Sequence, residues 1–138
     1  MLDSLMPTTM STTAATVLVV DDDRDARHIF QLALEHAGHR VLIAHDGAEG
    51  VKLAKEHEPD VILMDVMMPR VDGVSALHAL REAASTRDLP VIAITALASP
   101  DDMAALQPAG FNELLLKPIF PMEVVAAVRR WTTEAHPV

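Results

Sequence analysis

The stretch VLVVDDD, residues 17–23, predicts a β-strand that is buried on both faces and ends in a row of carboxylates. Its first four residues are apolar and mostly β-branched, which is typical of a parallel strand covered by helices on both sides. Asp21 and Asp22 follow directly. In an open parallel α/β sheet the carboxyl ends of the strands line one edge, and ligands bind at that edge. The stretch therefore predicts both a fold class and the position of a site.

Three more apolar runs end in a polar residue in the same way. The runs are residues 61–64, 91–94 and 114–116, and the polar residues that follow them are Asp65, Thr95 and Lys117. The sheet edge is thus expected to hold three carboxylates, a hydroxyl and an ammonium group in one small cleft. Carboxylate oxygens suit a divalent cation such as Mg²⁺, and an ammonium group suits a phosphoryl oxygen. The pattern favours phosphoryl chemistry with a metal ion.

Strands and helices alternate between these motifs. Apolar runs bounded by turn residues predict strands at 17–20, 40–44, 61–64, 91–94 and 113–116. Helical spacing of apolar residues predicts helices at 24–37, 46–56, 74–84, 100–107 and 121–131. Strict alternation predicts an α/β fold, a doubly wound five-stranded parallel sheet with five helices.

The composition favours one domain between two short tails. The chain has 138 residues, which is the size of one domain, and half of them are hydrophobic. Residues 1–15 contain a proline and a cluster of Ser and Thr without a strand or helix period, so we expect a flexible tail there. The domain is predicted to span 16–132, and 133–138 is predicted to be a C-terminal tail.

Charge and composition exclude several classes of function. The formal net charge of −9 disfavours a nucleic-acid-binding surface. The absence of cysteine excludes disulfides and thiol catalysis. No apolar run has the length of a membrane helix, and no secretory signal is recognisable, so we expect a cytoplasmic protein without a membrane partner. None of the seven histidines lies at a strand end near the expected cleft, and we expect them to be surface or partly packed residues.

Taken together, these motifs resemble a known family. The segments VLVVDDD (17–23), DVMMPRVDG (65–73), TA (95–96) and KP (117–118) are similar, in order and spacing, to the receiver domain of response regulators in two-component signalling. The resemblance covers about residues 16–131. It implies the flavodoxin-like receiver fold, in a single-domain protein similar to chemotaxis regulators.

The resemblance implies a role for each site residue. Asp65 would be the phosphoacceptor, consistent with the ability of a carboxylate to form an acyl phosphate. Asp21, Asp22 and Asp65 would hold Mg²⁺ together with the backbone carbonyl of Met67, since Mg²⁺ prefers oxygen ligands and retains several waters. Thr95 and Lys117 would contact the phosphoryl oxygens.

Two further features follow from the resemblance. The Lys117–Pro118 bond is expected to be cis. Three residues before the lysine, many members of the family carry Tyr or Phe, whereas this chain has Leu114. The usual aromatic response to phosphorylation is therefore not expected here, although a shift of the Thr95 hydroxyl remains open.

The predicted function is that of a phosphoacceptor response regulator. It would take a phosphoryl group from a phosphohistidine of a histidine kinase or histidine phosphotransfer protein, and would signal to a downstream protein by direct contact. We expect no enzyme activity beyond its own phosphorylation and dephosphorylation. The alternative is a receiver fragment of a longer hybrid histidine kinase or transcription factor.

Two other classes of function are disfavoured. Aspartyl-phosphate phosphatases of the haloacid-dehalogenase family carry a second aspartate two residues after the nucleophile, where this chain has Met67. A receiver that cannot be phosphorylated would not need the complete acidic set found here.

Overall fold

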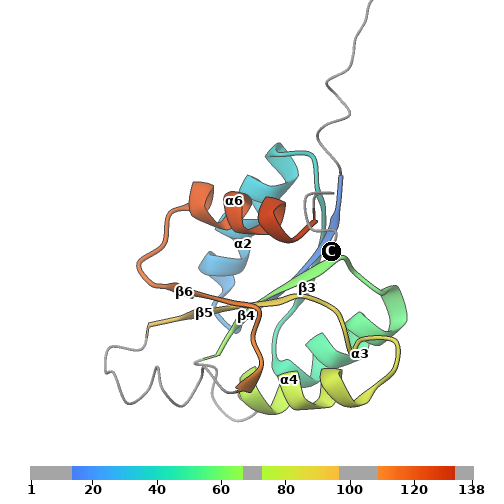
Figure 1. Cartoon of the computed structure of the whole chain (residues 1–138). Helices are drawn as coiled ribbons and strands as arrows, with labels where there is room; N and C mark the ends of the chain where they lie inside the picture. Colours follow the sequence, from blue (N-terminus) through green and yellow to red (C-terminus); the bar gives the residue numbers. More distant parts are fainter. Residues whose placement is uncertain (1–13, 67–72, 97–108, 133–138) are drawn as a thin grey trace, which may run out of the picture.

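The computed structural model describes residues 14–66, 73–96 and 109–132, and these form a parallel sheet covered by helices on both faces (Figure 1). The strands are β2 (Thr16–Val20), β3 (Arg40–Ala44), β4 (Val61–Asp65), β5 (Val91–Thr95) and β6 (Glu113–Leu116). The helices are α2 (Arg24–His36), α3 (Gly47–His57), α4 (Gly73–Glu82) and α6 (Pro121–Thr132). The predicted α/β fold is confirmed. The predicted helix at 100–107, residues 1–13 and the predicted tail at 133–138 lie outside the described residues.

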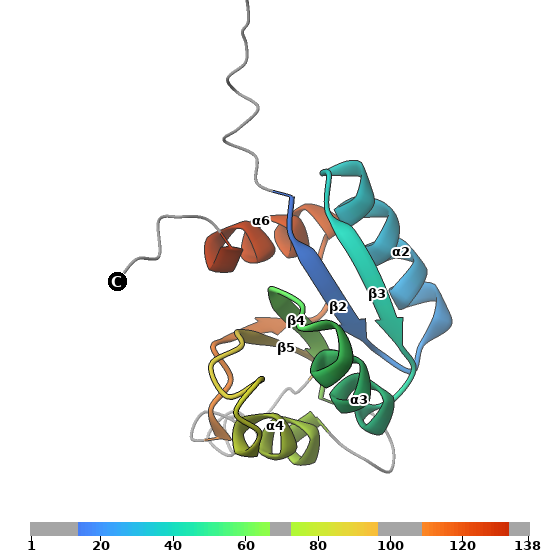
Figure 2. The same ribbon diagram turned by 90° about the vertical axis from the view of Figure 1, so that its right-hand side faces the viewer.

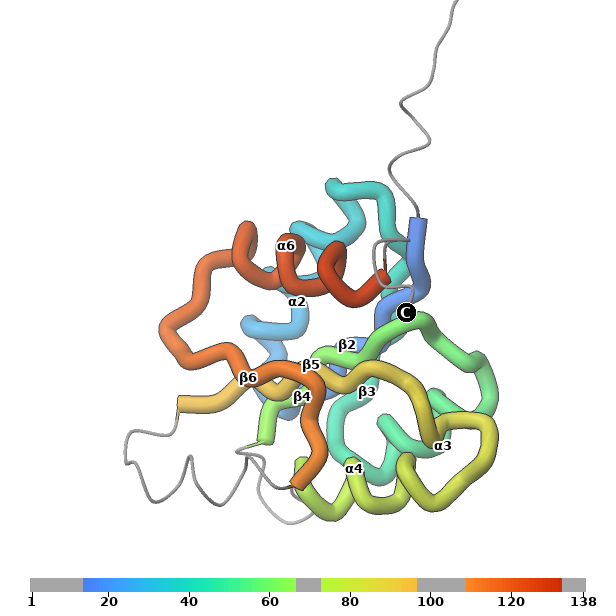
Figure 3. Tube along the Cα trace, in the orientation of Figure 1, coloured from blue at the N-terminus to red at the C-terminus, as the bar shows by residue number. Residues whose placement is uncertain are grey.

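The order of the strands explains where a site can form. The sheet runs β3-β2-β4-β5-β6, and every neighbouring pair is parallel. From β2 the chain moves to β3 on one side and then returns to β4 on the other side, a path that can be followed in Figure 3. The carboxyl ends of β2 and β4 therefore flank the point at which the strand order reverses, where open α/β sheets bind ligands.

Helices α2 and α6 cover one face of the sheet, and α3 and α4 cover the other (Figures 1 and 2). Strand β2 shows why its sequence is apolar from Val17 to Val20. Val17 and Val19 belong to the core under α2 and α6, whereas Leu18 and Val20 belong to the core under α3 and α4. Among the described helices, none is long and apolar enough to cross a lipid bilayer.

Aspartate caps turn the chain sharply after the first two strands. Asp23 is the N-cap of α2, and its Oδ1 accepts a hydrogen bond of 3.0 Å from the Asp25 amide. Asp46 caps α3 in the same way, accepting from the Glu49 amide at 2.8 Å. Such caps satisfy amide groups that the first turn of a helix leaves unpaired. The cap at Asp23 fixes the short loop that carries Asp21 and Asp22.

The start of β2 is held by side chains from neighbouring elements. Nδ1 of His39 accepts a hydrogen bond of 3.1 Å from the Ala15 amide, and Asp60 accepts one of 2.8 Å from the Thr16 amide. Burial, and then the charge of Arg129, lower the pKa of His39. His39 is buried, so the expectation that all histidines lie at the surface or are partly packed was wrong for this residue, whose ring accepts the bond from Ala15 just before β2.

Gly73 begins α4 in close contact with the residue that follows Asp65. A β-carbon at Gly73 would lie 2.7 Å from Cγ1 and 2.9 Å from Cα of Val66. The second contact is with the backbone, which cannot shift without moving Asp65. We therefore expect Gly73→Ala to lower the free energy of unfolding by about 1–3 kcal/mol, as overpacking does, even though Ala favours helices more than Gly. Urea unfolding followed by the fluorescence of Trp131, the single tryptophan, measures the loss.

Gly50→Ala provides the comparison for this variant. There the three atoms nearest to an added β-carbon all belong to the side chain of Val20, the nearest at 2.8 Å. A side chain adjusts more easily than a backbone, so the loss should be smaller than at Gly73. Equal stability of Gly73→Ala and the parent protein would contradict the close approach.

Candidate functional site

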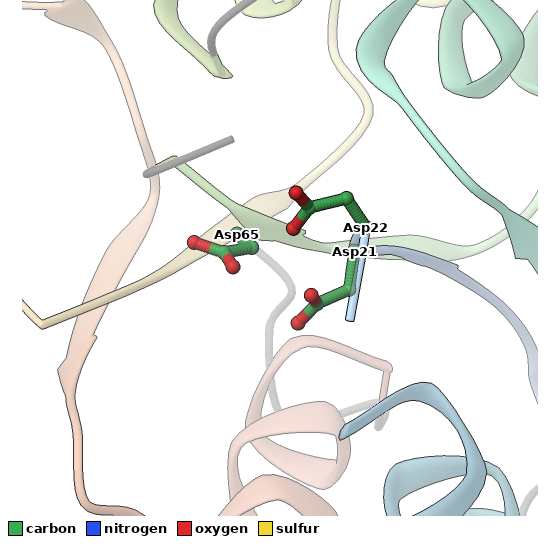
Figure 4. A group of neighbouring side chains, drawn as sticks. All are labelled: Asp21, Asp22 and Asp65. Atoms are coloured by element: carbon green, nitrogen blue, oxygen red, sulfur yellow. The ribbon is translucent and has the colours of Figure 1, made fainter. Parts of the chain in front are cut away.

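Three carboxylates meet at the carboxyl ends of β2 and β4 (Figure 4). Each of Asp21, Asp22 and Asp65 offers an oxygen, and these oxygens lie within 4.8 Å of one another. The side chains of Asp21 and Asp65 are buried, whereas that of Asp22 is exposed. In the described ranges no other group of three metal-binding side chains is as close. The predicted acidic residues are therefore brought together by the strand topology.

Backbone contacts hold Asp21 in place. Its amide donates to the carbonyl of Ala44 at 3.2 Å, and the Asp23 amide donates to its Oδ1 at 2.9 Å. Nη1 of Arg27 donates to the Asp21 carbonyl at 2.9 Å. Nothing in the sequence singled out Arg27, because an arginine in the second turn of a helix is usually a solvated residue. Its contact with Asp21 depends on how α2 packs beside β2.

One oxygen of this cluster indicates that the residues fit a cation. Within the described residues, Oδ2 of Asp21 is buried and has no hydrogen-bond partner. A buried carboxylate oxygen without a donor is costly. A bound divalent cation would supply the missing partner, and three carboxylates match the preference of Mg²⁺ for oxygen ligands. The arrangement fits the predicted metal.

The surroundings of Asp21 alter its protonation. Burial, first, and then the charge of Asp65 raise the pKa of Asp21 to about 6, against the opposing effects of the Asp23 amide and the Lys117 charge. A carboxylate with this pKa is ionised at neutral pH only at a cost in free energy. A cation would remove that cost, since it stabilises the charged form.

Lys117 and Thr95 lie at the same edge of the sheet as the three carboxylates. Nζ of Lys117 forms an ion pair with Oδ2 of Asp65 at 3.3 Å, and the Lys117 amide donates to the Thr95 carbonyl at 2.8 Å. Thr95 is fully buried at the end of β5, the strand that pairs with β4. The Lys117–Pro118 bond is cis, as predicted. Met67, the predicted carbonyl ligand, lies outside the described residues.

Leu114 occupies the position, three residues before Lys117, at which many receiver domains carry an aromatic ring. Leu114 is half-buried and packs against Val66 and Ala93, with Phe111 and Val74 in the same cluster. Val66 directly follows Asp65. Leu114 therefore lies close to the acidic cluster in the fold, but it is aliphatic and has no polar group to move.

Comparisons with known proteins agree with this geometry. The model of the response regulator receiver domain matches residues 17–129. The transcriptional regulatory protein PrrA of Mycobacterium tuberculosis is 43% identical over 117 residues, which are 85% of this chain and 49% of PrrA. This chain thus spans about half the length of that relative.

Solved structures of receiver domains are also similar to this chain. The chemotaxis response regulator CheY4 of Vibrio cholerae is 31% identical with a TM-score of 0.79, and the match covers 86% of this chain and 98% of CheY4. The receiver domain of the sensor histidine kinase PA1611 of Pseudomonas aeruginosa is 33% identical with a TM-score of 0.79, over 86% and 98% of the two chains. That structure has a magnesium ion coordinated in its active site cleft.

Proposed function

This chain belongs to the response regulator receiver family, and we propose that its Asp65 accepts a phosphoryl group from a phosphohistidine of a partner protein in a Mg²⁺-dependent step. The observation that carries the proposal is the buried carboxylate of Asp65, which lies beside Asp21 and Asp22 and 3.3 Å from the ammonium of Lys117. The proposed donor is a histidine kinase or a histidine phosphotransfer protein.

The transfer can be written for the residues of this chain. A carboxylate oxygen of Asp65 attacks the phosphorus, and a P–O bond forms as the P–N bond of the phosphohistidine breaks. The imidazole nitrogen of the donor keeps the electron pair and is protonated from solvent. Lys117 places a positive charge against a phosphoryl oxygen, and the hydroxyl of Thr95 donates to another. The step depends mainly on positioning and on neutralisation of charge.

The metal fits this scheme. Asp21, Asp22 and Asp65 would hold it, and the family resemblance adds the backbone carbonyl of Met67. When bound, Mg²⁺ supplies positive charge that offsets the repulsion between the carboxylates and the incoming phosphoryl oxygens. The magnesium ion in the PA1611 receiver domain supports this assignment.

The proposed output is protein contact with a downstream partner. The face formed by β6 and α6 would change when the hydroxyl of Thr95 moves toward the phosphoryl group. Because Leu114 replaces the usual aromatic residue, Thr95 would carry the response without a ring. We propose that the protein neither turns over an external substrate nor binds nucleic acid. A cytoplasmic location stays a prediction from the sequence.

The Mg²⁺ site predicts a large effect of Asp22. Its exposed carboxylate can be removed without leaving a cavity, yet the cation would lose a charged oxygen ligand. We expect Asp22→Ala to weaken Mg²⁺ binding at least about tenfold, since even indirect partners of a metal contribute that much. Calorimetric titration with Mg²⁺ measures the affinity.

Asp88→Ala is the matched control for Asp22→Ala. Asp88 is also an exposed aspartate, but it precedes β5 and therefore lies at the opposite end of the sheet from the cluster. It changes the net charge equally and should leave the affinity close to that of the parent. If the two variants bind Mg²⁺ equally well, the metal site lies elsewhere.

A second candidate is a receiver that works as part of a longer protein. It is favoured by the likeness to PrrA, a transcriptional regulatory protein of which this chain spans about half. In that case the phosphorylated receiver would act on an attached output domain. The mass of the native protein, measured on material from its source cells, separates the two candidates.

A further inference from the structure

A polar pocket of about 450 Å³ lies on the outer edge of the sheet, between α2 and the end of β3. Its wall on the helix side is formed by Arg24, Arg27 and His28, which fall on one side of α2 because their spacing is three and four residues. Ile43 and His45 form the wall on the strand side. Figure 2 shows the first turns of α2 beside the carboxyl end of β3. None of the five site residues lines this pocket.

The charge of the pocket is opposite to that of the chain. The chain carries a formal net charge of −9, yet two arginines and two histidines face this space. Within the described residues, the side chains of Arg24 and His28 make no hydrogen bond or ion pair, so their polar groups remain available to a ligand. The amino-terminal end of a thirteen-residue helix adds positive potential.

Two carboxylates near the pocket could repel an anion, and one of them is already paired with a histidine. Glu49 is engaged by His45, whose amide and Nδ1 lie 2.7 and 2.8 Å from its Oε1. Asp25 is the one carboxylate among the lining residues. The guanidinium of Arg27 is already oriented by its bond to the Asp21 carbonyl, which reduces the entropy lost on binding.

We propose that this pocket binds a small organic phosphate. A guanidinium group recognises the oxygens of a phosphate with parallel hydrogen bonds, and two arginines from one helix face converge here. The volume exceeds what a phosphate group needs and lies within the range of ligand pockets, and Ile43 offers an apolar surface to the remainder of the ligand. The Arg27–Asp21 bond links the pocket to the loop that carries the acidic cluster.

Adenosine monophosphate is a suitable probe in an NMR titration of ¹⁵N-labelled protein with EDTA present. Without metal, the three carboxylates repel anions, so binding at the acidic cluster is suppressed. We expect saturable shifts of the amide signals of residues 24–31 and 43–45, with a Kd of about 1 mM or tighter. Adenosine, which lacks the phosphate, should produce no saturable shift.

Three variants test whether the charged residues of this pocket determine the affinity for adenosine monophosphate. Arg24→Gln should weaken binding about tenfold, the loss of one charge-assisted hydrogen bond. Asp25→Asn removes the opposing carboxylate and should tighten binding about two- to threefold. Arg40→Gln is the matched control, because Arg40 is exposed at the other end of β3, and it should leave the affinity unchanged.

Unchanged spectra of the free variants away from the substituted residues establish that the fold is kept. Shifts that stay linear with ligand concentration overturn the proposal, and so do shifts centred outside residues 24–31 and 43–45. Equal binding of adenosine, or equal affinity of Arg24→Gln and Arg40→Gln, also overturns it. None of these outcomes bears on phosphorylation of Asp65, which is tested separately.

Discussion

Asp65→Asn is expected to abolish phosphorylation by acetyl phosphate in the presence of Mg²⁺. The parent protein should gain one phosphoryl group, because a carboxylate is able to form an acyl phosphate and the amide of asparagine is not. The substitution keeps the size of the side chain at a position that is only 4% exposed, so the fold should be retained. Intact-protein mass spectrometry after incubation measures the modification directly.

Two controls make the result specific to Asp65. Asp88→Asn changes an exposed aspartate at the opposite end of the sheet and should be labelled like the parent. Treatment with hydroxylamine should remove the label, because it cleaves acyl phosphates. Labelling of Asp65→Asn to the same extent as the parent would show that another residue accepts the phosphoryl group.

Asp21→Asn is expected to stabilise the metal-free protein at neutral pH while it weakens Mg²⁺ binding. In the folded protein the pKa of Asp21 is raised to about 6, first by burial and then by the charge of Asp65. Asparagine removes the buried charge but keeps an oxygen that can accept from the Asp23 amide, as Oδ1 does in the parent. The gain in the free energy of unfolding should be about 2–3 kcal/mol above pH 7, in EDTA.

The sign of the pH dependence follows from the direction of the shift. A carboxyl group whose pKa is raised on folding contributes stability that is fully present below its unfolded pKa, about 3.8, and is lost as the pH rises through about 6. The advantage of Asp21→Asn over the parent should therefore be absent near pH 4 and reach its full value above pH 7. Comparing each variant with the parent at the same pH cancels the titration of other groups, among them His39, whose lowered pKa destabilises the fold as the pH falls below about 6.5.

Urea unfolding followed by Trp131 fluorescence measures this difference. Trp131 reports on the packing of α6, because its Nε1 donates to Glu113 at 2.7 Å. Addition of Mg²⁺ should stabilise the parent by linkage and stabilise Asp21→Asn much less. A variant that is less stable than the parent in EDTA at pH 8 would show that the charge of Asp21 is not costly in the folded protein.

Much of the fold could be predicted from the amino-acid sequence without the structure. Apolar runs bounded by turn residues located all five strands, since a parallel strand covered on both faces reads as a nearly continuous apolar run. The ends of those runs placed Asp21, Asp22, Asp65, Thr95 and Lys117 at one edge, and the structure brings them to that edge. These features could be predicted because they depend on local periodicity and on one rule of sheet topology.

The features that could not be predicted from the sequence depend on contacts between residues that are distant along the chain. Asp21 and Asp22 are identical neighbours, yet one is buried with an oxygen lacking a partner and the other is exposed. Sequence cannot separate them, because burial depends on which elements cover each side chain. The ring of His39 accepts a hydrogen bond from Ala15, 24 residues earlier in the chain. Gly73 has no space for a β-carbon because α4 begins against Val66.

Short-range patterns therefore predicted the succession of strands and helices along the chain and the chemical types of the residues at the sheet edge. How those groups meet depends on the packing of distant segments: the 3.3 Å ion pair of Lys117 with Asp65, the bond of Arg27 to the Asp21 carbonyl, and the basic pocket between α2 and β3. Distances, burial and the resulting pKa of Asp21 arise only when segments far apart in the chain pack together, because each is set by the surroundings of a group as well as by its type.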